Sequence, residues 1–416
     1  MKHTAYLGLA GGLRGRLPVL GVMLAFGLVL GATAGMADVC NSPFLKYLQR
    51  PERIIYVWCI DAHGKNNDFM VTVDVDPHSK DYGKIVKTID LGSKGNEPHH
   101  FGFTDDRRYI YGATLFTSRL YLFDVGTDPD NPKLLKVIDF KQETGLTSPH
   151  SLYALPGRMM IPALGNAQGE VPAGIAEYTN DGKYIRTIMN PPNSPYGYDV
   201  AVKPEIDRLV SSGFTPLVNF SKPFPQMDKN HFGDQLILWD FSQMRPLATA
   251  KTAKSPLEIR WARQPGHNYG FTNCLLGDSI WLFRPTADGK LEVKEAAKTE
   301  PLPADLRQSV DDKYLYVTSF GAGDVEQFDI SDPDHVTLHS KVHIGAHPNM
   351  MNISIDGKRM FVTNSLLSTA DFGPDDFWMK LVRIDDNGTM QVDPKFDVDF
   401  TKLPNGPGRP HDMLEN

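Results

Sequence analysis

The sequence has few cysteines and lacks the short motifs that mark common cofactor and phosphate sites. Its 416 residues include three cysteines, Cys40, Cys59 and Cys274. It has no Gly-rich phosphate loop, no Gly-x-Ser-x-Gly elbow, no Cys-x-x-Cys pair and no haem-attachment motif. Phosphate-loop, serine-hydrolase, dithiol and c-type haem chemistries therefore have no support in the sequence.

Acidic residues are absent from the first 37 positions, which contain three basic residues and an apolar run from Leu17 to Leu30. Small residues follow this run and end at Ala37. The pattern predicts a secretory signal peptide over residues 1–37 and one mature domain over residues 38–416. A retained membrane anchor is the alternative. The expected location is the periplasm, with no membrane contact after cleavage.

The predicted mature chain has fewer basic residues than acidic ones. It keeps 40 Lys plus Arg against 50 Asp plus Glu, a net charge of −10 with histidine neutral. Such a chain repels a phosphate backbone, so nucleic acid is not an expected partner. Composition and charge do not determine whether the chain forms a homo-oligomer, so a homo-oligomer is one of the possible states.

A repeated segment begins at a proline and continues into an apolar strand, a tight turn and a second strand. Four copies keep the proline, and three of them carry histidine directly after it. These copies are Pro98-His99-His100, Pro149-His150, Pro256-Leu257-Glu258 and Pro410-His411-Asp412. Two further strands follow most repeats, and four strands per repeat predict a propeller blade.

The number and order of the repeats predict the fold class. Blades start near residues 98, 149, 198, 256, 305 and 348, and an incomplete unit precedes them. That first unit lacks an innermost strand, whereas Pro410 to Leu414 looks like an innermost strand with nothing after it. The sequence therefore predicts an all-β, seven-bladed β-propeller closed by the C-terminal strand. A β-sandwich with a second β domain is the alternative.

Two features follow from this arrangement. Pro216 to Gly233 is expected to be a long loop within the fourth blade, and long loops often cover a site.

Cys59 and Cys274 end the second strand of blades that are not neighbours, so no disulfide between them is expected. The odd cysteine count leaves at least one thiol free unless it pairs between chains.

Innermost strands line the centre of a propeller, so their first residues converge at one mouth. By register these residues are His99, His100, His150, Asp199, Glu258, Asp305, His347 and His411. His347 belongs to this set only weakly, because it precedes its proline. Neutral imidazole suits copper, zinc, iron and nickel. Hydrogen bonding among polar side chains, without a metal, is the alternative.

A metal site built from four of these histidines is the leading hypothesis. The expected ligands are His99, His100, His150 and His411. The candidate catalytic residues are the carboxylates Glu258 and Asp199, which would orient imidazoles or move protons.

Over nearly all of its predicted mature length, the chain resembles the selenium-binding protein / methanethiol oxidase family. The matching stretches are Val73 to Pro77, Pro98 to Gly102, Gly197 to Asp199, Pro256 to Arg260, Phe328 to Pro333, Asp356 to Arg359 with Ser365-Leu366, and Val398 to Phe400 ahead of His411. The run Ser148 to Arg158 and the signal peptide resemble the secreted bacterial methanethiol oxidase branch more than the cytosolic animal and plant branch.

The resemblance implies a seven-bladed propeller and a copper-dependent oxidation of methanethiol. Methanethiol, O2 and water would give formaldehyde, hydrogen sulfide and hydrogen peroxide. Copper would be the cofactor, and a small thiol and O2 would be the partners. The histidines proposed as copper ligands in the family correspond to the four selected above by register.

Two positions bear on rival functions. Animal members have a histidine in the stretch that corresponds to Phe320 to Asp324, where this chain has Ala322, so a copper role for that position does not apply to this chain. The cysteine that animal and plant members associate with selenium corresponds to Cys59. A non-catalytic selenium- or copper-binding carrier using Cys59, and an interaction platform with an inert centre, are therefore the alternatives to an oxidase.

Overall fold

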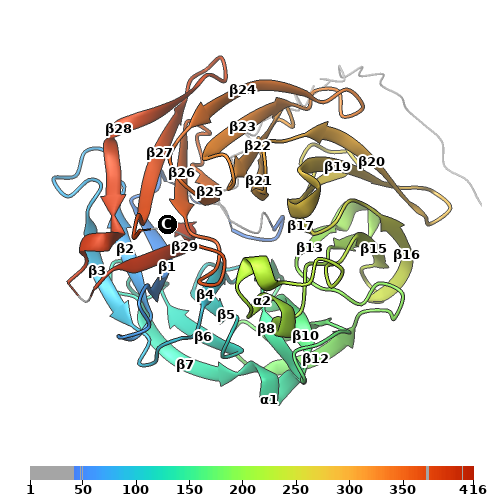
Figure 1. Ribbon diagram of the computed structural model, residues 1–416, viewed down its shortest axis with the longest axis horizontal. Helices are drawn as coiled ribbons and strands as arrows, with labels where there is room; N and C mark the ends of the chain where they lie inside the picture. Colours follow the sequence, from blue (N-terminus) through green and yellow to red (C-terminus); the bar gives the residue numbers. More distant parts are fainter. Residues whose placement is uncertain (1–41, 47, 49, 372–373, 405) are drawn as a thin grey trace, which may run out of the picture. The chain divides into compact units, whose positions relative to one another are not determined.

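The described part of the chain is a ring of antiparallel β-sheets. The computed structural model describes residues 42–46, 48, 50–371, 374–404 and 406–416. Seven sheets surround a central axis, which confirms the predicted seven-bladed β-propeller (Figure 1). The predicted signal peptide, its cleavage site and Cys40 lie outside the described residues. Within the described residues, no helix is both long and apolar enough to cross a membrane.

Six of the seven blades contain four strands, which follow one another from the innermost outward, and in the third blade two short strands occupy the innermost position. Blade one contains β29 (Gly408–Glu415), β1 (Ile54–Asp61), β2 (Phe69–Asp74) and β3 (Ile85–Asp90). Blade two contains β4 (Pro98–Phe103), β5 (Tyr109–Thr114), β6 (Arg119–Asp124) and β7 (Lys133–Asp139). Blade three contains β8 (Leu146–Pro149) with β9 (Tyr153–Leu155), then β10 (Arg158–Asn166), β11 (Gly174–Thr179) and β12 (Tyr184–Met189), and α1 (Phe140–Thr144) precedes it.

The remaining blades follow the same order. Blade four contains β13 (Val200–Lys203), β14 (Arg208–Ser211), β15 (Gln235–Asp240) and β16 (Arg245–Lys251), with α2 (Leu217–Phe220) between β14 and β15. Blade five contains β17 (Pro256–Trp261), β18 (Gly270–Cys274), β19 (Ser279–Pro285) and β20 (Leu291–Lys298). Blade six contains β21 (Pro303–Gln308), β22 (Tyr314–Ser319), β23 (Asp324–Asp329) and β24 (Thr337–His343). Blade seven contains β25 (Pro348–Ile353), β26 (Arg359–Asn364), β27 (Trp378–Ile384) and β28 (Met390–Asp399). Single 3-10 turns span Pro204–Ile206, Phe224–Gln226, Leu275–Gly277 and Phe400–Lys402.

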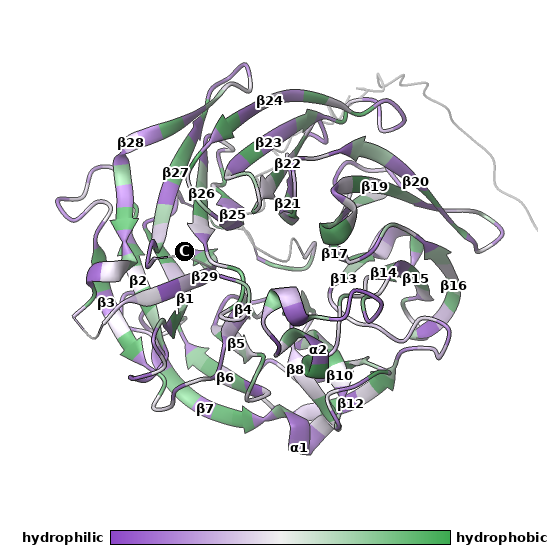
Figure 2. Ribbon diagram, in the orientation of Figure 1, coloured by the Kyte–Doolittle hydropathy of each residue, from purple (hydrophilic) through white to green (hydrophobic). Residues whose placement is uncertain are grey.

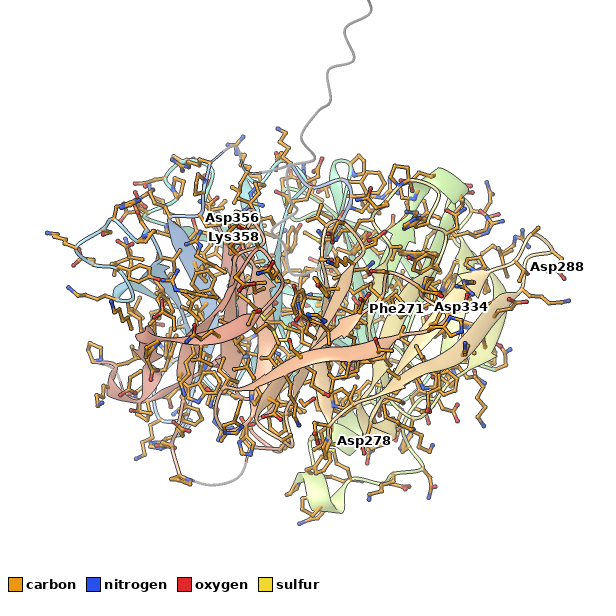
Figure 3. All side chains as sticks on the ribbon, turned by 90° about the horizontal axis from the view of Figure 1, so that it is seen from above. Phe271, Asp278, Asp288, Asp334, Asp356 and Lys358 are labelled. Atoms are coloured by element: carbon orange, nitrogen blue, oxygen red, sulfur yellow. The ribbon has the colours of Figure 1, made fainter. Side chains whose placement is uncertain are left out.

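Burial decreases from the inner strands to the outer ones. Every residue of β1 and β4 is buried, because neighbouring blades pack against both faces of these strands. Outer strands such as β3 alternate between half-buried and exposed residues, and polar and apolar residues are mixed along them (Figure 2). Seen from the side, Asp288 lies at the outer edge of the ring, whereas Phe271 lies within the sheets (Figure 3). The core therefore lies between blades.

The C-terminal strand closes the ring, as the sequence predicts. β29 pairs antiparallel with β1, with Ile55 opposite Glu415 and Ile60 opposite Arg409. Met413 and Leu414 on this strand are fully buried. The first blade is therefore built from both ends of the described chain.

The innermost strands share a backbone feature at their start. Five residues that precede the first proline have a positive φ, namely Glu97, Ser148, Ser255, Leu302 and His347. Directly after the proline, the pairing with the next strand shifts by one residue in blades one, two, five, six and seven. The residues within these bulges are His411-Asp412, His99-His100, Leu257-Glu258, Ala304-Asp305 and Asn349-Met350. A bulge interrupts the alternation of side chains, so adjacent residues are free to turn toward the same side.

Deleting residues 408–416 should damage stability as well as the centre of the ring. β1 would lose its inner partner and present a free sheet edge, and the buried side chains of Met413 and Leu414 would be lost. We expect a loss of at least about 4 kcal/mol in the free energy of unfolding, or no folding at all. Thermal and denaturant melting measure this.

His411→Ala is the matched control, because it removes one side chain and leaves the strand in place. It should melt close to the wild-type protein. A truncated chain that melts like the full-length one would contradict closure by β29.

Candidate metal centre

Four imidazoles lie together at the centre of the ring. They form the histidine cluster, which consists of His99 and His100 on β4, His150 directly after β8, and His411 on β29. Ring centroids are 3.8 Å apart for His99 and His411, 4.4 Å for His100 and His150, and 4.7 Å for His99 and His100. None of the four is more than 4% exposed. The structure thus brings together all four histidines selected by register.

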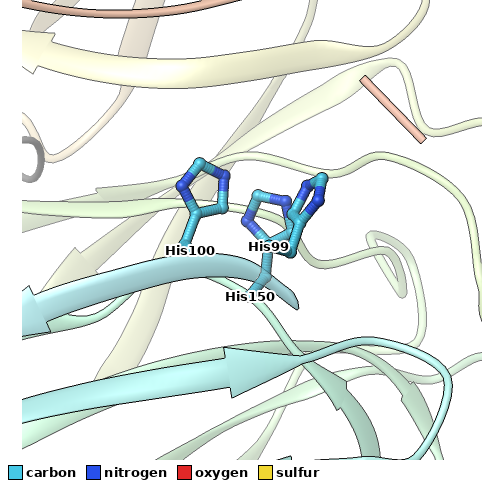
Figure 4. Close-up of side chains that lie close together, drawn as sticks. All are labelled: His99, His100 and His150. Carbon is cyan, nitrogen blue, oxygen red and sulfur yellow. The ribbon is translucent and has the colours of Figure 1, made fainter. Parts of the chain in front are cut away.

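Three members of the cluster have nitrogen atoms placed to share one ion. One nitrogen each from His99, His100 and His150 lies within 4.8 Å of the others (Figure 4). His411 completes the cluster by stacking on His99. Adjacent residues of one strand ordinarily point to opposite faces, and the bulge after Pro98 explains why His99 and His100 meet instead.

Each imidazole of the cluster has one buried nitrogen without a hydrogen-bond partner. These atoms are Nδ1 of His99 and Nε2 of His100, His150 and His411. Buried polar atoms are nearly always paired, so four unpaired nitrogens at one place need an explanation. Lone pairs on neutral imidazole nitrogen are strong ligands for copper and zinc, and the donor set therefore fits a metal ion.

The second nitrogen of three rings is held by a neighbour. Nδ1 of His100 lies 3.1 Å from Oδ2 of Asp412, and Nδ1 of His150 lies 3.2 Å from Oγ of Ser151. Nδ1 of His411 lies 3.2 Å from the carbonyl oxygen of Ser365. An N–H that donates to such an acceptor fixes the tautomer and leaves Nε2 free to bind a metal.

The ionisation of the cluster also suits metal binding. Burial lowers the pKa of His99, His150 and His411 well below the usual range, and neighbouring imidazoles lower it further. These rings are therefore neutral, the form that binds metals. Burial also lowers the pKa of His100, but the hydrogen bond and charge of Asp412 outweigh it, and the net shift is upward.

A buried ionic layer lies next to the cluster. The Arg260 guanidinium donates from Nη2 to Oε2 of Glu258 at 2.6 Å and from Nη1 to Oδ2 of Asp199 at 3.0 Å. Arg307 pairs with Asp305 at 3.2 Å. All five side chains are at most 3% exposed. The carboxylates that register places beside the histidines therefore occur as ion pairs.

The two candidate catalytic carboxylates differ in their surroundings. Oδ2 of Asp199 accepts both from Arg260 and from the backbone N–H of Ile259 at 2.8 Å. Oε1 of Glu258 is buried without a partner, and burial raises the pKa of Glu258 to about 7. A carboxyl with this pKa exchanges a proton near neutral pH. Glu258 thus suits proton transfer, whereas the contacts of Asp199 suit holding Arg260 in place.

Three residues around the cluster were not selected from the sequence. Asp412 follows Pro410 at the spacing at which Glu258 follows Pro256, so register alone was enough to select it. Tyr198 packs against His150 with the two rings tilted by 39° and their centroids 3.8 Å apart. The contact of Ser365 uses a carbonyl oxygen, which no pattern of side chains can indicate. His347, the weak member of the predicted set, instead stacks on Phe320 at 4.6 Å.

Cys59 and Cys274 are both free, as predicted, and both are fully buried. Cys59 lies on β1 opposite Pro410, and its Sγ is 3.6 Å from the carbonyl oxygen of Val57. Burial raises the pKa of the Cys59 thiol well above its usual value. Among the described residues, Cys59 is absent from the group whose atoms come close enough to share a metal.

Sequence comparison places the chain in a family. A model of the 56 kDa selenium binding protein family (SBP56) matches residues 39–415. The chain belongs to the SBP56 family. A relative named methanethiol oxidase from Hyphomicrobium sp is 35% identical, covering 94% of this chain and 92% of that protein. Another protein of that name, from Ruegeria pomeroyi, is 33% identical over 94% of this chain and 95% of its own.

Solved structures agree with the fold. A hypothetical selenium-binding protein from Sulfolobus tokodaii matches with a TM-score of 0.79 and 28% identity, covering 88% of this chain and 94% of that one. A periplasmic gluconolactonase from Pseudomonas aeruginosa matches with a TM-score of 0.61 at 12% identity, covering 87% of this chain and 98% of that one. The second likeness shows the fold alone.

His150→Ala should weaken metal binding while the fold survives. The change removes an unpaired Nε2 from the cluster, and it affects no strand pairing because His150 lies between β8 and β9. We expect copper affinity to fall at least about 100-fold, since loss of an outer partner alone costs 10- to 100-fold. Copper competition against a chelator, followed by metal analysis, measures this.

His339→Ala, an exposed histidine on β24, is the matched control and should keep wild-type affinity. Wild-type copper affinity in His150→Ala would remove His150 from the site.

Proposed function

We propose that this chain is a periplasmic, copper-dependent methanethiol oxidase. The reaction would convert methanethiol, O2 and water to formaldehyde, hydrogen sulfide and hydrogen peroxide. One observation carries the proposal: four buried imidazoles, each with an unpaired nitrogen, meet at the centre of a chain whose relatives are named methanethiol oxidase.

The donor set supports copper as the resident metal. His100, His150 and His411 would present Nε2, and His99 would present Nδ1. Bound copper supplies a Lewis acid with affinity for sulfur and a centre that passes electrons from the thiol to O2. Asp412 holds His100 in the required tautomer through Nδ1. Nδ1 of His411 lies 3.2 Å both from the carbonyl oxygen of Ser365 and from Nδ2 of Asn349, and these two contacts hold the ring in place.

The proton balance of the reaction gives Glu258 a role. Two electrons and two protons pass from methanethiol to O2, and water then replaces sulfur at the carbon. Glu258 has an unpaired Oε1 and a pKa of about 7, so it can accept a proton released beside the cluster. Arg260 holds the other oxygen of Glu258, which keeps the carboxyl group directed.

The position of Cys59 argues against the rival carrier function. Its thiol is fully buried in the hydrophobic core around blade one. A carrier needs a thiol that selenium or copper can reach. The raised pKa of this thiol also disfavours the thiolate, which is the form that reacts.

Copper reconstitution separates the oxidase from its rivals. Chelated protein should not oxidise methanethiol, and protein reloaded with copper should consume O2 and release hydrogen sulfide, formaldehyde and hydrogen peroxide in equal amounts. Cys59→Ala should keep at least about a third of the rate, a change of about 0.7 kcal/mol in barrier.

Cys274→Ala is the matched control, because this buried thiol ends the equivalent strand of blade five. Copper binding without thiol oxidation would indicate a carrier. Loss of turnover in Cys59→Ala alone, with copper retained, would give the thiol a part in catalysis.

Glu258→Gln should remove a limb of the pH profile. Ionised Glu258 is the base, so kcat/KM of the copper-loaded wild-type protein should rise with pH along a limb set by Glu258, whose pKa without metal is about 7. Positive charge at the cluster favours the ionised form, so copper would move this limb toward lower pH. The glutamine variant should lose the limb and about 100-fold or more in rate while it keeps its copper. An unchanged profile would exclude Glu258 as the base.

A further inference from the structure

Two inserted loops meet on one side of the histidine cluster. The first joins β14 to β15 and carries α2, which lies near the centre of the ring in Figure 1. The second follows β26. The backbone N–H of Phe224 in the first loop donates to the carbonyl of Thr369 in the second at 3.0 Å, and Oγ1 of Thr369 donates to the carbonyl of Phe220 at 2.9 Å. These hydrogen bonds join the β14–β15 loop and the loop after β26 into one unit, which we call the roof.

The roof is fixed to the strand that carries the cluster. Glu97 directly precedes Pro98 and His99, and it is buried. Its Oε1 accepts from the backbone N–H of Ser368 at 3.0 Å, and its Oε2 accepts from Oγ of the same serine. The second loop is thus held in a defined position relative to His99.

An apolar pocket lies between this roof and the imidazoles. His99, His150 and Tyr198 form one wall, and Phe220, Leu257 and Leu367 are among the other lining residues. The pocket is small, because the centre of a water-sized molecule can occupy only about 10 Å³ within it. Every further lining residue in the described chain is leucine or phenylalanine, so no charged side chain other than histidine reaches the pocket.

This lining determines what the pocket can accept. A charged or strongly polar molecule would lose its hydration without gaining partners, which disfavours thiols with amino or carboxylate groups. A short alkyl group gains apolar contact, and the imidazoles of His99 and His150 lie at one wall, where the sulfur would reach the proposed metal. Phe220 is fully buried and stacks on Phe116 at 6.0 Å, so this wall is held in place.

We propose that this pocket binds the alkyl group of the thiol and that Phe220 limits its length. The inference rests on the proposed function, since it assigns a specificity-determining residue to the same site. Methanethiol would fit beneath Phe220, and longer alkanethiols would meet its ring.

Phe220→Leu tests the assignment with a series of methanethiol, ethanethiol, 1-propanethiol and 1-butanethiol. The copper-loaded variant should gain about tenfold or more in relative kcat/KM for 1-propanethiol over methanethiol, since one methylene is worth 10- to 200-fold in such pockets. Phe232→Leu makes the same change in the same cluster of buried side chains without touching the pocket, and should keep the wild-type preference.

A second variant allows the same test if Phe220→Leu does not fold. Leu367→Val enlarges the pocket from the other loop by one methylene, and should move the preference in the same direction if Phe220→Leu does not fold. The assignment is overturned if both folded variants keep the wild-type preference, or if Phe232→Leu shifts it equally.

Two measurements do not depend on turnover. Xenon under pressure should occupy this pocket in crystals of the wild-type protein, because small apolar cavities bind it. Calorimetry should show ethanethiol, but not cysteine, binding to the copper-loaded protein. If thiols bind with the predicted size limit and none is oxidised, the pocket stands and the oxidase function fails. If neither xenon nor ethanethiol binds there, the pocket assignment fails whatever the activity.

Discussion

The β-bulge after the first proline of the innermost strands is the feature on which the centre of the ring depends. A regular strand would turn His100 away from His99, and the two rings would not meet at 4.7 Å. The bulge instead turns consecutive side chains toward the axis. Blade five has the same bulge at Leu257 and Glu258, and Glu258 pairs there with Arg260. The bulge, which is repeated in five blades, therefore determines which side chains face the centre of the ring.

Ring closure couples this site to global stability. His100 and Asp412 are 312 positions apart in the chain, yet they share a hydrogen bond because β29 joins the first blade. His411 comes from the same last strand. Part of the cluster thus forms only when the whole ring has closed, so the proposed metal site would depend on the complete fold rather than on any single blade.

Register predicted the fold and the cluster because both repeat along the sequence. His99, His150 and His411 each follow a proline at an equivalent position, and for His99 and His411 the strand also bulges directly after that proline. The contacts that orient the rings could not be predicted in this way. The carbonyl of Ser365 and the attachment of Glu97 to Ser368 depend on the path of one loop, and His347 shows that a shift of one or two positions in register is enough to leave the centre.

The balance of buried charge gives an independent reason for a cation at the centre. In the ion pairs around the cluster, the buried acids are Asp199, Glu258, Asp305 and Asp412; Arg260 and Arg307 pair with the first three, and His100 lies against Asp412. Fully ionised, the acids exceed the guanidinium groups by two charges, and uncompensated charge in the interior is costly. Burial, together with the charges of Asp199 and Asp305, raises the pKa of Glu258, and the hydrogen bond and charge of Asp412 raise the pKa of His100 against the effect of its burial. A metal ion held by the neutral imidazoles would offset the deficit, leave Glu258 ionised, and so prepare it to accept a proton.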